Sequence, residues 1–345
     1  MRVSRPDAAA WSARLADPRL TDLPFTQRPA WAAHKAHAGW FAHYLIVEAA
    51  EDWAGIALLT RRLPGGLGRF AYAARGPVVV AATSSAEGAL RAAIVNELSS
   101  LRADGVTLVR FEPGESLPLP HDADPVHPPA ALRAVLQRPY LGAAVPCGAL
   151  QPRSSAIIDL RGGIAAVRAG YKSSQRSTLR TAERHGVSVR EGTLGDLPAF
   201  AAVMAATAAR AGFTGRDAAT YASLLESHGG DATLLVAEAP ELGVIGGLLL
   251  VHTRTTSTYL YAGTTDAGSA LRATYALLDA AIVHAIERGS ARLDLWGLPT
   301  PGIAAFKAGW GGQAVAYAGG MEQVIDPLRG RLAAVALRLR GGGRA

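Results

Sequence analysis

The order of strand-like and helix-like segments is the feature that most restricts how this chain can fold. Hydrophobic patterning predicts a first series of elements: strands over 40–49, 53–63 and 70–80, a helix over 84–105 and a strand over 106–113. After a helix over 194–213, a second series repeats this order: a strand meander over 233–265, a helix over 270–290 and a strand over 291–297. The architecture repeats although the sequence does not. We therefore expect an α/β (α+β) protein with two similar tandem domains, mixed central sheets and an acyltransferase-like fold.

The length of the chain agrees with two domains. A chain of 345 residues is too long for one ordinary hydrophobic core. A proline-rich loop at 113–129 and a short helix at 130–140 separate the two series of elements. We place the first domain at 1–150 and the second at 151–317, which begins with a strand and then a helix over 162–186.

Composition restricts the class of protein. Hydrophobic residues make up 49% of the chain and charged residues 18%, which is typical of a well-packed globular protein. The net charge of +7 favours an anionic partner such as nucleic acid, a phosphorylated ligand or an acidic membrane surface. A GC-rich genome would account for the surplus arginine equally well.

Cysteine content and hydrophobic segments predict the compartment. Cys147 stands alone, which excludes an intramolecular disulfide and a cysteine-based zinc site. The N-terminal residues lack the apolar core of a signal peptide. The longest apolar stretch, 242–251, is about half the length that crosses a bilayer. We expect a soluble cytoplasmic protein.

A basic stripe lies in the predicted helix 162–186. It consists of four residues at four-residue spacing: Lys172, Arg176, Arg180 and Arg184. On a helix this spacing aligns like charges, which repel by roughly 0.2–0.5 kcal/mol per pair. Phosphates of a bound nucleic acid would compensate that repulsion. We predict anion binding here, and a solvated helix face is the alternative.

The segment 294–312, DLWGLPTPGIAAFKAGWGG, places one lysine in an apolar, glycine-rich frame. Its first residues form the end of the predicted strand 291–297, and α/β folds commonly bind ligands at the carboxyl ends of strands. We expect a held loop in which Phe306 and Trp310 serve as anchors. Lys307 would then present a fixed positive charge to a developing oxyanion or a phosphate. A surface lysine in an ordinary turn is the alternative.

This segment resembles the C-terminal signature of the FemAB/FemX family, in which Asp-x-x-Gly precedes Phe-Lys-x-x-(aromatic)-Gly-Gly. The likeness continues upstream in YKSSQRSTLRTAERHG, in LPAFAAVMAATAARAGFTGRDAATYASLL and in TYLYAGTT. In the first domain, TQRPAWAAHKAHAGW resembles the family pattern Gln-x-x-x-Trp-x-x-x-Lys. The resemblance covers nearly the whole chain, and its most specific part lies in the second domain.

The resemblance implies two tandem GNAT-like domains, the first completed by the C-terminal segment 318–345. It also implies an enzyme that transfers glycine, alanine or serine from aminoacyl-tRNA to a side-chain amine of a peptidoglycan precursor. That acceptor would be UDP-MurNAc-pentapeptide or lipid II. The first domain would bind the precursor and the second the aminoacyl-tRNA. No cofactor or metal is implied, the chain lacks the coiled-coil arm of some members, and we expect a monomer.

The family roles transfer to individual positions of this chain. The resemblance implies that Lys307 stabilises the reacting ester and that Lys35 contacts a substrate phosphate. It implies that Arg216, Tyr221 and Tyr261 bind the precursor, and Tyr259 is less favoured than Tyr261 for that role. Arg216 and Tyr221 lie one residue further apart than in the family pattern, and Trp310 replaces a phenylalanine. Glu112-Pro113 stands where the family often has Asp-Pro near the acceptor amine. Glu112 is therefore the candidate base, with deprotonation by substrate or water as the alternative.

Two other functions remain open from the sequence. An acetyl-CoA-dependent N-acetyltransferase would need Arg/Gln-x-x-Gly-x-Gly/Ala before a helix, so that N–H groups face the pyrophosphate. The corresponding turn, in AGTTDAGSALRATY, lacks this arrangement. A non-catalytic nucleic-acid-binding protein would account for the charge but not for the Lys307 segment.

The C-terminal stretch 326–345 is predicted to be helical. One face of this helix carries four apolar residues: Leu328, Leu332, Val335 and Leu339. We expect it to dock on the first domain, and a peripheral contact with an anionic membrane is the alternative.

Overall fold

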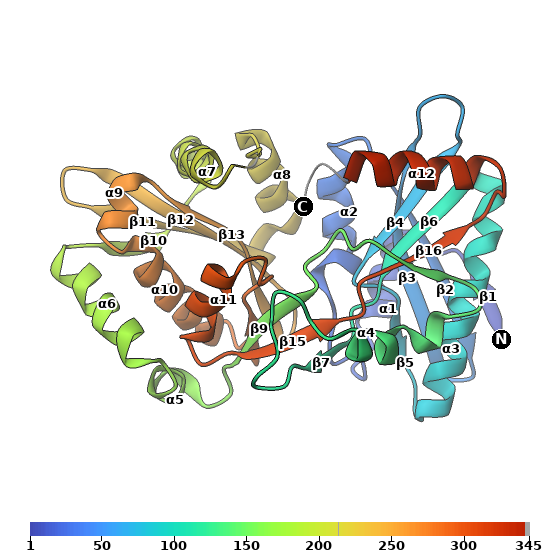
Figure 1. The fold of residues 1–345 in the computed structure, drawn as a ribbon, viewed down its shortest axis with the longest axis horizontal. Coiled ribbons are helices and arrows are strands. Elements are labelled where there is room, and N and C mark those ends of the chain that lie inside the picture. The colour runs from blue at the N-terminus through green and yellow to red at the C-terminus, as the bar shows by residue number, and fades with distance from the viewer. Residues whose placement is uncertain (213, 342–345) are drawn as a thin grey trace. The chain divides into compact units, whose positions relative to one another are not determined.

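The computed structural model describes residues 1–212 and 214–341. The chain forms two compact units, Met1–Arg153 together with the C-terminal segment from Ala316, and Ser154–Val315. Each unit is built on its own mixed sheet with helices against it (Figure 1), so the predicted α/β class is confirmed. In the described part of the chain no helix is both long and apolar enough to cross a membrane.

The first unit contains most of the N-terminal half of the chain. Its strands are β1 (Arg2–Ser4), β2 (Phe41–Ala49), β3 (Asp52–Arg62), β4 (Arg69–Ala74), β5 (Val78–Val80), β6 (Val106–Glu112), β7 (Ser116–Pro118), β8 (Val145–Cys147) and β16 (Gly320–Val324). Its helices are α1 (Ala8–Leu15), α2 (Pro29–Ala36), α3 (Ser84–Glu97), α4 (Ala130–Gln137) and α12 (Arg329–Gly341).

The sheet of the first unit has the order β1-β2-β3-β4-β6-β16-β8, with β5 paired to β3. Its pairs are antiparallel except β4 and β6, which run parallel. Successive strand residues point to opposite faces. Leu45 and Val47 therefore pack with α3, whereas Tyr44 and Ile46 pack with α1 on the other face. Both faces are covered, which accounts for the nearly continuous apolar run of β2 and β3.

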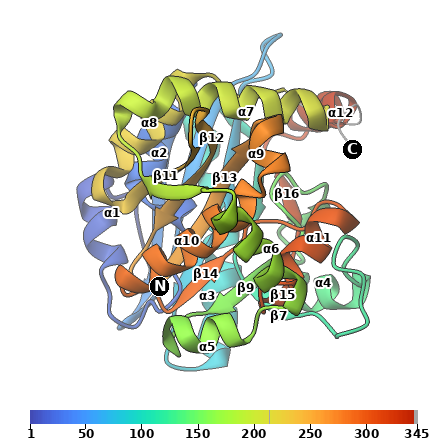
Figure 2. The same cartoon turned by 90° about the vertical axis from the view of Figure 1, so that its left-hand side faces the viewer.

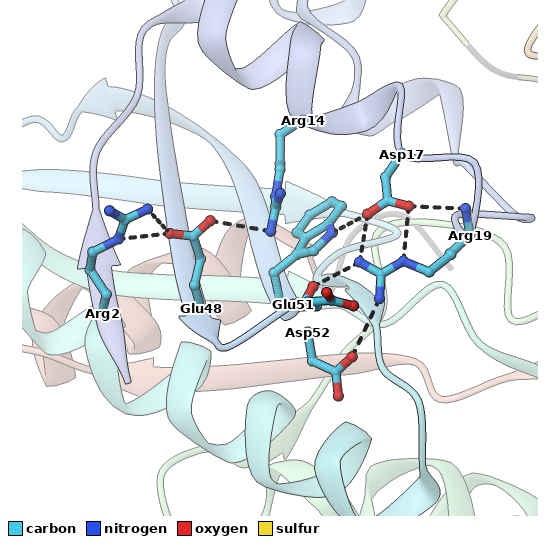
Figure 3. Close-up of polar contacts among 8 residues, drawn as sticks. Arg2, Arg14, Asp17, Arg19, Glu48, Glu51 and Asp52 are labelled. Atoms are coloured by element: carbon cyan, nitrogen blue, oxygen red, sulfur yellow. Dashed lines mark hydrogen bonds and ion pairs between the residues drawn. The ribbon is translucent and has the colours of Figure 1, made fainter.

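A polar network ties the N-terminal segment to this sheet (Figure 3). Glu48 accepts hydrogen bonds from the Arg2 Nε at 2.9 Å and pairs with Arg14 at 3.2 Å. Asp17 accepts from the indole nitrogen of Trp53 at 2.9 Å and also pairs with Arg19. The Arg19 guanidinium holds the pKa of the Asp17 carboxyl well below its usual range.

Helix α12 docks on the first unit, as expected, but not through the apolar face that the sequence predicts. Ala333 and Ala334 are buried against Phe70 and Leu108 of the sheet. A Cβ at Gly330 would lie 2.2 Å from the main-chain oxygen of Thr107. Small residues thus let the helix approach the sheet closely, and the predicted apolar face is turned outward.

The second unit contains the remaining elements. Its strands are β9 (Ser154–Asp159), β10 (Ser188–Glu191), β11 (Ala232–Ala239), β12 (Gly243–His252), β13 (Thr256–Thr264), β14 (Arg292–Asp294) and β15 (Gln313–Tyr317). Its helices are α5 (Gly163–Ala169), α6 (Ser173–Arg184), α7 (Leu197–Ala211), α8 (Ala218–His228), α9 (Asp266–Ala270), α10 (Ala273–Glu287) and α11 (Pro301–Ala308).

The sheet of the second unit follows the order β10-β11-β12-β13-β14-β9-β15. Strands β13 and β14 are parallel, and the meander before them is antiparallel, which repeats the pattern of the first unit. Helix α7 covers one side of the meander and α10 the other (Figures 1 and 2). With 15 residues each, α7 and α10 are the longest helices among the described residues, and neither forms a coiled-coil arm.

Two elements that the sequence predicts as continuous are each divided into two in the structure. The helix over 162–186 is broken between α5 and α6, because the Lys172 N–H leaves the helix to donate to the Gly309 oxygen at 2.8 Å. The strand over 70–80 is divided between β4 and β5, since Arg75 takes a φ of 54°. In the first case a tertiary hydrogen bond outweighs helical periodicity.

Candidate functional site

Lys307 lies in the last turn of a helix, so the predicted held loop is wrong. Helix α11 begins where Thr300 Oγ1 accepts the N–H of Ile303 at 3.3 Å, with Pro301 in its first turn. A proline there costs little because the first N–H groups of a helix have no intrahelical partner. The residues that suggested a loop are therefore the start signals of a short helix.

The Lys307 ammonium turns back to the end of β14 and is only 6% exposed. Its Nζ donates to three successive main-chain oxygens, those of Leu295, Trp296 at 3.2 Å and Gly297 at 2.8 Å. These oxygens converge because Trp296 and Gly297 take φ values of 48° and 90°. An ammonium has three N–H donors, so the turn accepts all of them.

The surroundings of Lys307 shift the pKa of its ammonium group. Burial lowers the pKa of Lys307 to about 8, while the nearby Asp294 carboxylate acts in the opposite direction. The Tyr259 ring centroid lies 5.2 Å from Nζ and adds a cation–π contact. Asp294 also shapes the turn, since it accepts the Trp296 N–H at 2.8 Å and the Ser155 hydroxyl. The result is a positive charge held at a strand tip.

Aromatic side chains fix α11 from the other side. Trp310 is fully buried and lies edge-on to Tyr171, with ring centroids 4.8 Å apart. Phe306 lies edge-on to Tyr275 at 5.2 Å and contacts Trp310. Rotation of α11 would break several of these contacts, so the direction of Lys307 is set by packing as well as by hydrogen bonds.

The start of α6 is joined to the end of α11. Besides the Lys172–Gly309 main-chain bond, Gln175 Nε2 donates to the Phe306 oxygen at 3.4 Å. A Cβ at Gly309 would lie 1.8 Å from that Gln175 nitrogen, so the contact requires glycine there. Lys172 and Lys307, two predicted site residues, thus belong to adjoining segments of the second unit (Figure 2).

The basic stripe is shorter than predicted. Lys172 is the N-cap of α6 with an extended ψ of 151°, so only Arg176, Arg180 and Arg184 keep helical four-residue spacing. All four side chains are exposed. Arg180 and Arg184 line a surface depression of about 640 Å³. Three guanidinium groups along one helix can contact successive phosphates of an RNA strand.

Three predicted precursor-binding residues meet in the second unit. Tyr221, on α8, is buried and lies edge-on to Tyr261 of β13, with ring centroids 5.5 Å apart. The Arg216 guanidinium lies 5.6 Å from the Tyr261 ring. Burial raises the pKa of both tyrosines, so both hydroxyls remain neutral donors near neutral pH.

A β-bulge gives the two β13 tyrosines different neighbours. Tyr259 pairs with Leu250 and Tyr261 with Leu249, which leaves Leu260 as the extra residue. Tyr259 faces Lys307, whereas Tyr261 contacts Tyr221.

Glu112 lies at the end of β6 in the first unit and is buried. Its carboxylate accepts from the Tyr72 hydroxyl at 2.8 Å and from the N–H groups of Leu150 at 2.6 Å and Gln151 at 3.1 Å. Burial raises the pKa of Glu112 despite these donors. Lys35, at the end of α2, places its ammonium 4.4 Å from the Trp31 ring centroid. Both residues belong to the first unit, and the other predicted site residues belong to the second.

The sequence model of the FemAB family matches residues 21–242 and 239–338, which is nearly the whole chain.

The chain belongs to the FemAB family.

Solved structures agree with a FemAB fold. A crystal structure of FemX has a TM-score of 0.79 at 16% identity and covers 97% of this chain and 99% of that one. A tandem GNAT protein from the clavulanic acid biosynthesis pathway has a TM-score of 0.52 at 12% identity, over 94% and 99%. L-PGS from Bacillus licheniformis has a TM-score of 0.51 at 12% identity, over 94% and 99%. No curated protein matches the sequence.

These comparisons confirm the predicted tandem GNAT-like fold and the predicted family. FemAB membership supports transferase activity in the formation of peptidoglycan cross-bridges.

In this FemAB protein the turn that would hold acetyl-CoA is capped by a side chain of its own. Thr265 Oγ1 accepts the N–H of Gly268 at 3.0 Å, and Asp266 lies in the first turn of α9. The Asp266 carboxylate is exposed and pairs with Arg210 at 2.9 Å. The argument against acetyl-CoA therefore remains the missing glycine pattern.

Sequence reasoning missed several residues of these clusters. The sequence predicts Asp294 only as part of the Asp-x-x-Gly signature, without a contact, and Gln175 lies within the predicted helix 162–186 without a distinguishing pattern. Tyr72 contacts Glu112 because β4 and β6 pair in parallel, with Ala74 opposite Glu112. A signal for Asp294 exists, since an acidic residue at the end of a buried strand is unusual unless it is hydrogen-bonded.

Proposed function

We propose that this FemAB protein transfers an amino acid from aminoacyl-tRNA to a side-chain amine of a peptidoglycan precursor stem peptide. The amino acid would be glycine, alanine or serine, and the acceptor UDP-MurNAc-pentapeptide or lipid II. The observation that carries the proposal is Lys307, a buried ammonium at a strand tip beside the start of a basic helix.

The proposed reaction is aminolysis of an ester. The acceptor nitrogen bonds to the ester carbonyl carbon, the bond to the terminal ribose oxygen breaks, and that oxygen leaves with a proton. An ester is already activated, so positioning and stabilisation of the oxyanion can supply most of the barrier reduction. Lys307 would supply positive charge near the oxyanion. Because its three donors are engaged, direct donation requires exchange of its longest bond, the one to Trp296.

We propose that Glu112 is the general base that accepts the proton of the acceptor amine. An amine with a solution pKa near 10.4 must lose a proton before or during attack. Burial raises the pKa of Glu112 toward neutral pH. A carboxylate with a raised pKa is a stronger base and accepts a proton more readily.

The remaining residues would bind the two substrates. Arg216, Tyr221 and Tyr261 form a cation-and-hydroxyl cluster suited to a phosphorylated precursor. Lys35 would contact a precursor phosphate from the first unit. Lys172 and the α6 arginines would bind tRNA phosphates. We further propose that the protein acts as a monomer without a cofactor.

Transfer assays with labelled aminoacyl-tRNAs and each precursor test the proposal. We expect transfer by the wild type, and a loss of about 10²–10³ in kcat for Lys307→Ala. Lys35→Ala is the matched control, because loss of a phosphate contact raises the precursor KM instead. Near wild-type transfer by Lys307→Ala would contradict the role of Lys307. Acetyl transfer from acetyl-CoA, or RNA binding without transfer to either precursor, would contradict the function.

A further inference from the structure

Helix α12 presents two different faces. The face toward the first unit carries the small residues Gly330, Ala333 and Ala334 and is buried. The opposite face carries four apolar side chains with large exposed fractions: Leu328 73%, Leu332 53%, Val335 52% and Leu339 79%. Their spacing of four, three and four residues places them on one side of the helix. Docking on the sheet therefore leaves this outer face uncovered by the described part of the first unit.

The C-terminal segment 327–345 carries charge of one sign. Residues 327–345 include five arginines and no acidic residue. Of these, Arg329 and Arg331 are exposed at the start of α12. Asp326, just before the helix, accepts the N–H groups of Leu328 and Arg329 and so serves as a cap. An apolar stripe with basic neighbours is typical of helices that lie at a membrane surface.

The hairpin between β3 and β4 carries the same chemistry beside α12. Leu63 and Leu67 of this hairpin pack with Leu337 of α12 in one cluster. Figure 1 shows the hairpin and α12 close together in the first unit. Two arginines lie over aromatic rings at its base, Arg61 over Trp40 at 4.7 Å and Arg69 over Phe41 at 5.9 Å.

We propose that the outer face of α12, with the β3–β4 hairpin, binds the surface of an anionic lipid bilayer. The helix would lie in the interface, with its leucines among the acyl chains and its arginines at lipid phosphates. Trp40 and the exposed Phe41 suit the headgroup region, where aromatic side chains are enriched.

The other occupants fit less well. RNA would account for the arginines but not for four exposed aliphatic side chains. A second copy docked by the same face would bring Arg329 and Arg331 close to their own equivalents, and like charges repel. Of these three occupants, only an anionic bilayer accounts for both the leucines and the arginines.

Vesicle co-sedimentation of the whole chain tests the proposal without tRNA or precursor, so its outcome is independent of the proposed reaction. We expect binding to phosphatidylglycerol-rich vesicles about tenfold or more tighter than to phosphatidylcholine vesicles. The double variant Leu332→Gln/Val335→Gln should lose about tenfold or more of that affinity. Arg329→Gln/Arg331→Gln should lose about tenfold on the anionic vesicles only.

The matched control is Leu194→Gln/Leu242→Gln, which changes two exposed leucines of the second unit and should bind like the wild type. All these positions are exposed, so melting temperatures should stay near the wild-type value, and this measurement excludes misfolding as the cause. Absence of wild-type binding, or equal binding by the Leu332→Gln/Val335→Gln variant, would overturn the proposal. Conversion of a dimer to a monomer by that variant in light scattering would also overturn it.

Discussion

At the scale of single residues, Lys307 shows how burial and hydrogen bonding can oppose each other. Its three N–H groups donate to the oxygens of Leu295, Trp296 and Gly297, which favours the charged form. Burial nevertheless lowers its pKa to about 8. The lysine therefore has two functions in one position: it closes the turn after β14 and keeps a positive charge there at neutral pH.

The free energy of unfolding should depend on pH because Lys307 titrates at a lower pH in the folded state than in the unfolded chain. As pH rises above about 8 the folded state loses the Lys307 proton, whereas the unfolded chain keeps it up to about pH 10.5. Stability therefore rises with pH in this window, because the unfolded state binds more protons. Relative to Lys307→Met, the wild type should gain about 2 kcal/mol in unfolding free energy between pH 8 and 10. Urea denaturation at several pH values measures this, and parallel curves for the two proteins would contradict it.

Glu112 gives a second prediction at this scale. If Glu112 accepts the amine proton, Glu112→Gln should lower the transfer rate by about 10²–10⁴ with little change in either KM. Wild-type activity should rise as pH increases through the raised pKa of Glu112, and the variant should lack that limb. Single-turnover rates across pH measure both effects.

Glu112→Asp is the control for that experiment, because it keeps a carboxylate and should retain measurable transfer. A Glu112→Gln rate close to the wild-type rate would instead favour deprotonation by substrate or water.

At the scale of elements, small residues decide where helices can dock. Gly309 allows Gln175 of α6 to reach the end of α11, and Gly330 allows α12 to reach Thr107. Neither contact follows from helical periodicity, which predicted a continuous helix over 162–186 and an inward apolar face for α12.

Gly330→Ala should therefore weaken the docking of α12. The added Cβ would lie 2.2 Å from the Thr107 oxygen, a main-chain atom that moves little. We expect a loss of about 1–3 kcal/mol in unfolding free energy and faster proteolysis at α12. Gly88→Ala in α3 is the matched control, since its Cβ meets no atom within 4 Å and should be neutral or slightly stabilising. Equal effects of the two substitutions would contradict close docking.

At the scale of the whole molecule, charge is concentrated rather than spread evenly. The net charge is +7, and the α6 arginines and the α12 segment contribute strongly to it. The two groups belong to different units, α6 to the second and α12 to the first. We attribute the first to RNA and the second to lipid, so the two kinds of binding should respond to different substitutions.

Salt dependence of tRNA binding tests the first attribution. Neutralising Arg176, Arg180 and Arg184 to glutamine should lower the slope of log affinity against log salt by about 2. Anisotropy with labelled deacylated tRNA at increasing KCl measures the slope. The control changes three exposed arginines elsewhere, Arg2, Arg102 and Arg161. If the control variant lowers the slope of log affinity against log salt as much as the α6 variant does, tRNA binding depends only on net charge and the attribution to α6 is wrong.

The sequence by itself determined the repeated order of elements, the α/β class and the family, because alternation and helical spacing are local and the Lys307 segment is distinctive. It also singled out Arg216, Tyr221 and Tyr261, which the fold brings together in spite of their unusual spacing.

Only the tertiary structure decided where those elements break and what their side chains meet. The Lys172–Gly309 bond ends a helix, Lys307 points into a turn, and α12 docks by its alanines. Each of these depends on contacts between residues far apart in the chain, where hydrogen bonding and close packing outweigh local preference.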